Sequence, residues 1–150
     1  MRGLYVAVVG PGACPAGVEA EAEAVGRALA EAGVVLVCGG LGGVMEAACR
    51  GAKAAGGTTV GILSGDDRGA ANPWVDVALP TGLGEARNAL VVRSADAVIA
   101  VARGYGTLSE VALALKIGKP VVGLGTWDIE GVEAAVDPQE AVAKAVGFVS

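Results

Sequence analysis

The chain alternates short apolar runs with segments of helical periodicity, and this alternation constrains its fold more than any other feature. The apolar runs cover residues 4–10, 34–40, 58–63, 96–102 and 120–124, with a shorter candidate at 75–79. Most are continuous rather than alternating, which is the pattern of strands buried on both faces of a sheet. Helical spacing is found at residues 18–32, 42–57, 84–94, 107–117 and 138–146.

Strands that alternate with helices are joined by right-handed crossovers, which gives a parallel sheet covered on both faces. We therefore predict an α/β fold in which residues 1–150 form one nucleotide-binding-like domain. It is Rossmann-like, with an open, mostly parallel sheet flanked by helices. Asp137 is predicted to cap the last helix, because Pro138 and Glu140 follow at favoured positions. The polar segment 64–74 is predicted to be a loop.

Composition limits the partners of this chain. Aromatic residues are only 3% of a sequence that is 53% hydrophobic, so Val, Ala, Leu and Ile must form the core. The net charge of -5 argues against nucleic-acid binding, which needs a basic surface. No apolar run has the length of a membrane span. The three cysteines lack CxxC spacing, which disfavours a disulfide framework and structural zinc. We expect a cytoplasmic protein without a metal, a bound cofactor, a nucleic-acid partner or a membrane partner.

The sequence contains no histidine. Catalytic triads with histidine, carboxylate–histidine zinc sites and histidine general bases are therefore excluded. Any acid–base chemistry falls to Asp, Glu, Arg, Tyr or Cys.

Three glycine-rich turns follow predicted strands. In an open parallel sheet the strands' carboxyl ends share one edge, where amides at helix N-termini bind anions. The candidate phosphate-binding residues are Gly10, Gly39, Gly40, Gly42, Gly43, Gly104, Tyr105, Gly106 and Thr107. The alternatives are an ordinary turn at residues 10–12, tight strand–helix packing at the other two, and a capping role for Thr107. The first turn lacks the GxGxxG pattern, and the chain has no GxxxxGK[ST], so NAD and ATPase functions are disfavoured.

Two charged residues and an amide complete the candidate site. Arg87 and Asn88 lie near the start of the predicted helix 84–94, and Glu110 lies one turn into helix 107–117. An arginine there suits a phosphate or a base, although a solvated helix face explains it equally well. Glu110 is placed to meet sugar hydroxyls or a water molecule. Arg87 and Glu110 are therefore the candidate catalytic residues, and Asn88 is a candidate ligand-binding residue.

Three segments together resemble a known family. "GGLGGVMEAACRGAKAAGG", "TGLGEARN" and "GYGTLSEVALALKIGKPV" are similar to the family labelled "possible lysine decarboxylase". That family contains the cytokinin-activating phosphoribohydrolases (the Lonely guy family) and the molybdenum cofactor carrier proteins. The resemblance extends from about Val6 to Leu124. The segments "GEARN" and "GVMEAA" resemble the sequences of the carrier branch more than those of the cytokinin enzymes.

The phosphoribohydrolase signature, Pro-Gly-Gly-x-Gly-Thr-x-x-Glu after an Arg-Lys pair, matches this chain in part. The matching residues are Arg87, Gly104, Gly106, Thr107 and Glu110. Ala102 and Arg103 stand where the signature has Pro-Gly, and Asn88 stands where it has lysine. Arg103 thus brings bulk and charge to the predicted pocket mouth.

The resemblance implies two functions. The first is hydrolysis of the N-glycosidic bond in a nucleoside 5′-monophosphate, with Glu110 stabilising an oxocarbenium-like transition state and Arg87 steadying the base. The second is non-catalytic binding of molybdenum cofactor or a related phosphorylated pterin. A third alternative, from composition, is a scaffold that acts through protein partners. Lysine decarboxylation is disfavoured because none of the four lysines has a cofactor-like setting. The resemblance also implies a homodimer or homotetramer.

Overall fold

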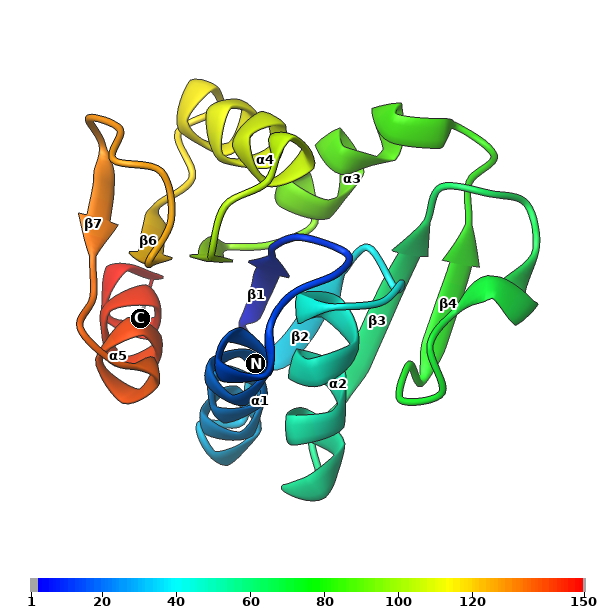
Figure 1. Ribbon diagram of the computed structural model, residues 1–150, viewed down its shortest axis with the longest axis horizontal. Coiled ribbons are helices and arrows are strands. Elements are labelled where there is room, and N and C mark those ends of the chain that lie inside the picture. Colours follow the sequence, from blue (N-terminus) through cyan, green and yellow to red (C-terminus); the bar gives the residue numbers. More distant parts are fainter. Residues whose placement is uncertain (1–2, 150) are drawn as a thin grey trace.

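All strands of the central sheet run parallel. The computed structural model describes residues 3–149, and within them one seven-stranded sheet has the order β4-β3-β2-β1-β5-β6-β7 (Figure 1). The strands are β1 (Tyr5–Val9), β2 (Val35–Cys38), β3 (Thr59–Leu63), β4 (Val77–Pro80), β5 (Ala97–Val101), β6 (Val121–Leu124) and β7 (Val132–Ala134). Every adjacent pair is parallel.

Helices cover both faces of this sheet. They are α1 (Ala16–Glu31), α2 (Val44–Ala54), α3 (Asn88–Arg93), α4 (Tyr105–Lys116) and α5 (Pro138–Val149). Figure 1 shows α3 and α4 together on one side and α1, α2 and α5 on the other. The predicted α/β, Rossmann-like architecture is confirmed.

The differences from the sequence prediction lie at weakly patterned segments. β7 was not predicted, because it is a three-residue edge strand with only Val132 packed inward. The helix predicted at 84–94 begins as a 3-10 turn over Gly84–Arg87, and α3 itself starts at Asn88. The loop 64–74 contains a short 3-10 turn. The predicted cap of α5 is confirmed, because the Asp137 carboxylate accepts the Glu140 amide at 2.8 Å.

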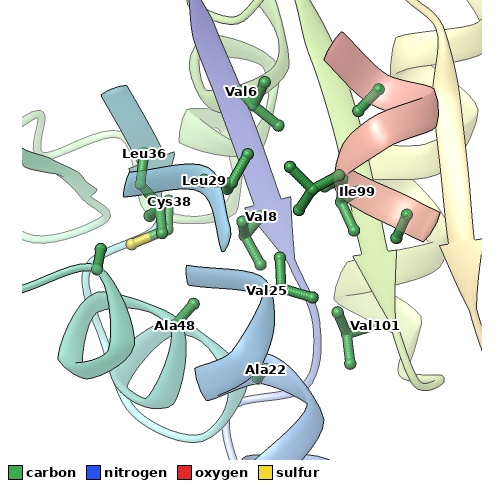
Figure 2. Close-up of a cluster of buried hydrophobic side chains, with 14 of the residues drawn as sticks. Val6, Val8, Ala22, Val25, Leu29, Leu36, Cys38, Ala48, Ile99 and Val101 are labelled. Atoms are coloured by element: carbon green, nitrogen blue, oxygen red, sulfur yellow. The ribbon is translucent and has the colours of Figure 1, made fainter. Parts of the chain in front are cut away.

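Small aliphatic side chains fill the space between sheet and helices. Figure 2 shows Val6 and Val8 of β1 with Ile99 and Val101 of β5 on the side that faces α1. The alternate residues of the same strands face the second layer, formed by α3 and α4, and are just as apolar. Both faces of each central strand are therefore buried, which explains the continuous apolar runs in the sequence.

The helices α1 and α2 pack backbone to backbone. A methyl group on Gly26 would overlap the carbonyl oxygen of Ala48, and one on Gly51 would overlap that of Glu23. These two glycines therefore set the separation of the helices. The contact fixes the position of α2 against α1.

The order of the strands reverses next to β1. From β1 the chain adds β2, β3 and β4 outward on one side, and it then returns to place β5 on the other side. The connections that leave the carboxyl ends of β1 and β5 diverge, so a crevice opens between them. This switch point is where an open parallel sheet binds ligands.

A separate observation concerns the length of the helices. Within residues 3–149, none is both long and apolar enough to cross a bilayer.

The helix contact gives a stability prediction. Gly26→Ala is expected to lower the free energy of unfolding by about 1–3 kcal/mol, because overpacking outweighs the better helix propensity of alanine. Gly147 of α5 is the control, because a methyl group there would meet nothing within 4 Å among residues 3–149. Gly147→Ala is expected to raise stability by up to about 1 kcal/mol. Urea unfolding measures both free energies of unfolding. Changes of equal size and the same sign in the two variants would contradict the close contact at Gly26.

Candidate functional site

The three glycine-rich turns lie at the same edge of the sheet. Residues 10–12 follow β1, residues 39–43 follow β2 and residue 104 precedes α4 after β5. A cavity of about 290 Å³ opens at the switch point. We call it the switch-point cavity. Eight of the twelve predicted site residues line it: Gly10, Arg87, Asn88, Gly104, Tyr105, Gly106, Thr107 and Glu110.

A second cavity of about 410 Å³ adjoins the first. It shares Arg87, Asn88, Tyr105 and Gly106 with the switch-point cavity. We call it the adjoining cavity. Together the two hollows have room for a ligand larger than a free phosphate ion.

The glycines that follow β2 lie behind the cavity rather than along its wall. A methyl group on Gly39 would meet the Arg87 guanidinium at 2.7 Å and the Met45 sulfur at 2.8 Å. Gly40 and Gly43 have φ angles of 76° and 61°, which disfavour a side chain. These glycines admit close packing and bring Arg87 against the end of β2. A direct contact between a ligand and Gly39, Gly40, Gly42 or Gly43 stays a prediction.

The first turn of α4 supplies free backbone amides to the cavity. Gly104 is the residue before the helix, Tyr105 is the first helical residue, and a methyl group on Gly106 would meet nothing within 4 Å. The first amides of a helix lack partners inside the helix and carry a partial positive charge. Thr107 is the third helical residue, so it is not the cap that the sequence allowed.

Two buried polar atoms beside this turn lack partners. Among residues 3–149, neither the Thr107 hydroxyl Oγ1 nor the Arg87 Nε has a hydrogen-bond partner, although both atoms are buried. Thr107 is 2% exposed and Arg87 is 9% exposed, and both residues line the switch-point cavity. We call these two atoms the orphan pair. Because buried polar atoms are nearly always hydrogen-bonded in folded proteins, the orphan pair is an unusual feature beside this cavity.

Arg87 is held in place by its neighbours. Its Nη1 donates to the side-chain oxygen of Asn88, and its Nη2 lies 3.5 Å from the Gly39 carbonyl oxygen. The Asn88 amide nitrogen in turn donates to the Ser109 hydroxyl at 3.2 Å. This chain of contacts connects α3 to α4. It therefore fixes a positive charge in the wall shared by both cavities.

Glu110 is a buried acid in the same cavity. It is 7% exposed, and burial raises its pKa to about 7, although the nearby Arg87 charge opposes the shift. A carboxyl group with such a pKa holds its proton for part of the time at neutral pH. It can therefore donate a hydrogen bond to an anion or act as an acid or base.

Sequence reasoning missed several lining residues. Pro11, Gly12 and Met45 also line the switch-point cavity, and Leu41, Ser64, Glu85 and Ser109 line the adjoining one. Pro11 and Gly12 belong to a turn that the sequence had singled out. Met45 is apolar at a helical spacing, so its pattern indicates the core and not a site.

Other places in the chain offer less to an anion. Another hollow, of about 760 Å³, lies at the amino ends of the strands, where the Asp96 carboxylate accepts a hydrogen bond from the Tyr5 amide. In the part of the chain that the structure describes, no three side chains of the metal-binding types gather.

The fold and the crevice define this protein as a Rossmann-like α/β protein with a ligand-sized hollow at its topological switch point. Comparison with known proteins gives the family. The chain belongs to the SLOG cluster4 family, whose model matches residues 3–147.

Three known proteins are similar to this chain over nearly its whole length. An uncharacterized protein of Archaeoglobus fulgidus is 45% identical over 95% of this chain and 94% of its own length. The molybdenum cofactor binding protein of Rippkaea orientalis is 39% identical, with a TM-score of 0.95 over 100% of this chain and 99% of that one. The molybdenum cofactor carrier protein of Chlamydomonas reinhardtii is 38% identical, with a TM-score of 0.87 over 99% and 98% of the two chains.

The buried acid gives a pH prediction. Glu110 has a pKa of about 7 in the folded state against 4.5 as its ordinary value, so the folded state binds the proton more tightly. Its contribution to stability is complete below pH 4.5 and is lost as the pH rises through 7. The loss amounts to about 3 kcal/mol at most.

Urea unfolding of the wild type and of Glu110→Gln at pH 5 and pH 8 measures this loss. Glutamine does not titrate. From pH 5 to pH 8, the free energy of unfolding of the wild type is therefore expected to fall relative to that of the variant. Other titrating groups cancel in the comparison. A stability difference that is the same at both pH values would refute the burial of an ionisable acid at this position.

Proposed function

We propose that this protein binds and carries a phosphorylated small molecule of the molybdenum cofactor type in the switch-point cavity, without chemical turnover. Two of its structural relatives are named for binding or carrying that cofactor, and they match nearly the whole chain. The ligand's phosphate lies on the first turn of α4. Its remaining atoms extend into the adjoining cavity.

The observation that carries this proposal is the orphan pair. A phosphate oxygen accepts several hydrogen bonds, and the Thr107 hydroxyl and Arg87 Nε are buried donors of two residues that line the cavity, so a shift of their side chains brings them to the phosphate. The first turn of α4 lines the same cavity, and its unpaired amides and the helix dipole favour a negative charge there. Both orphaned donors gain a partner when such an anion binds.

The backbone before α4 supports carriage over hydrolysis. The phosphoribohydrolase signature has proline at the position of Ala102. Here Ala102 has a φ angle of 62°, in the left-handed region. Proline is locked near −65°, so this backbone does not accept it. The loop that leads to the phosphate-binding turn thus differs in conformation from one that contains the signature.

Hydrolysis of a nucleoside 5′-monophosphate is the second candidate, and one observation favours it. Glu110 combines burial, a pKa of about 7 and a place in the cavity beside Arg87. This combination is typical of acids that take part in catalysis. In a carrier the same carboxyl group, when protonated, donates a hydrogen bond to the ligand.

A second copy of the chain is proposed to cover an apolar surface beside α3. Val77 and Leu79 of β4 pair in register with Val60 and Ile62, which pack in the core layer under α3 and α4. Yet Val77 and Leu79 are 45% and 48% exposed. Large apolar exposure on one face indicates an interface. Light scattering is expected to give at least twice the chain mass of 14.6 kDa, and a monomer mass would contradict this.

Thr107→Val tests the proposed phosphate site. The change keeps the shape of the side chain and removes one donor, so affinity for AMP and for 6-hydroxymethylpterin phosphate is expected to fall about ten- to a hundred-fold by calorimetry. Because the hydroxyl makes no internal hydrogen bond in residues 3–149, the unfolding midpoint is expected to hold or rise.

Thr126→Val is the matched control. Its hydroxyl is also buried without a partner among the described residues, but it lines a different cavity. Affinity is expected to stay unchanged in this variant. Equal effects of the two substitutions would refute the phosphate site. The same AMP samples distinguish the two functions, because release of free adenine that disappears in Glu110→Gln would establish hydrolysis instead of carriage.

A further inference from the structure

Three side chains form a stack beside the start of α4, and one of them, Tyr105, lines the switch-point cavity. Tyr105 and Arg103 lie on either side of Gly104, and Trp127 lies in the loop that follows β6. The Tyr105 and Trp127 ring centroids are 6.4 Å apart with an interplanar angle of 23°. The Arg103 guanidinium carbon lies 5.4 Å from the centroid of Trp127. We call these three residues the aromatic stack.

The aromatic stack is anchored to the start of α4. The Trp127 indole nitrogen donates to the Gly104 carbonyl oxygen at 3.2 Å, which ties the loop after β6 to the residue before the helix. The Arg103 charge over the indole adds a cation–π contact. Arg103 packs on Trp127 and is not among the residues that line the switch-point cavity. Its side chain therefore does not fill the cavity.

Tyr105 is the member of the stack that faces the ligand space. It lines both the switch-point and the adjoining cavity, and yet it is 86% exposed. A tyrosine needed only for packing would bury more of its ring, since burial of the ring is what stabilises the fold. The ring thus lies near-parallel to the Trp127 ring while most of its surface stays open.

The position of Tyr105 suits a ligand that combines a phosphate with a flat ring. Tyr105 and Thr107 are the first and third residues of α4, and both line the switch-point cavity. Tyr105 also lines the adjoining cavity, into which the rest of a ligand whose phosphate is bound at Thr107 would extend. Flat heteroaromatic rings stack on tyrosine with little dependence on their substituents.

From this arrangement we propose that Tyr105, braced by Trp127 and Arg103, is the subsite that stacks on the planar heteroaromatic ring of the phosphorylated ligand. This inference rests on the proposed function, because it takes the phosphate to lie at Thr107. It adds ring recognition by the Tyr105 side chain to the phosphate binding by the first turn of α4. Pterin and purine rings share the required flat shape.

Calorimetry with two kinds of probe tests the subsite. Ribose 5-phosphate has the phosphate without a ring, whereas AMP and 6-hydroxymethylpterin phosphate have both. Tyr105→Ala is expected to weaken binding of the two ring ligands about ten-fold or more and to leave ribose 5-phosphate unchanged. Tyr105→Phe keeps the ring and is expected to bind like the wild type. A stronger effect on one ring ligand than on the other identifies the preferred ring.

Thr107→Val separates this inference from the proposed function. That variant is expected to weaken all three probes alike, whereas a failure of the proposed function appears as no binding of any probe by the wild type. Ring-ligand affinity that is unchanged in Tyr105→Ala would overturn the stacking subsite and leave the phosphate site standing. An equal loss of affinity for ribose 5-phosphate in Tyr105→Ala would also overturn it. Tyr105 would then affect only the conformation of the first turn of α4 and not the ring of the ligand. Unfolding midpoints of the variants verify that each is folded.

Discussion

The pairing of β1 with β5 is the constraint on which the rest of this structure depends. Val8 lies beside Ile99 and Val9 beside Ala100, in the middle of a sheet whose strand order reverses at this point. Because the two strands are parallel, the turn after β1 and the start of α4 lie at the same edge. The crevice is thus a result of topology, and the short, bulk-free turns keep it open. The pairing brings residues that are distant in sequence to the same cavity. Gly10 and Arg87, for example, are 77 positions apart and both line it.

The fold could be predicted because its signals are local and repeated. Continuous apolar runs, each followed by a helical pattern, indicate strands buried on both sides, and the structure agrees at β1, β2, β3, β5 and β6. β7 gave no such signal, since one packed valine in three residues is not a pattern. The order of the strands could not be predicted from the sequence. No local pattern indicates on which side of β1 the chain places β5.

The site could be predicted in part. The residues of the third glycine turn, together with Arg87 and Glu110, line one cavity, as expected when strand ends share an edge. The sequence could not separate glycines needed for packing from glycines beside open space. Gly43 lies against the backbone of the turn after β1, whereas Gly106 has free space around its α-carbon. That difference depends on neighbours distant in sequence. The stacking of Arg103 on Trp127 likewise joins residues from two loops.

The central claim is that an oxyanion is held where the first turn of α4 meets two buried donors that have no hydrogen-bond partner among residues 3–149. A crystal structure of the protein grown with a phosphorylated pterin or AMP tests it most directly. The account predicts phosphate density within hydrogen-bond distance of Thr107 Oγ1 and the amides of the first turn. Density for the phosphate at the opposite edge of the sheet, beside Asp96, or a Thr107 hydroxyl that stays without a partner in the complex, would contradict it.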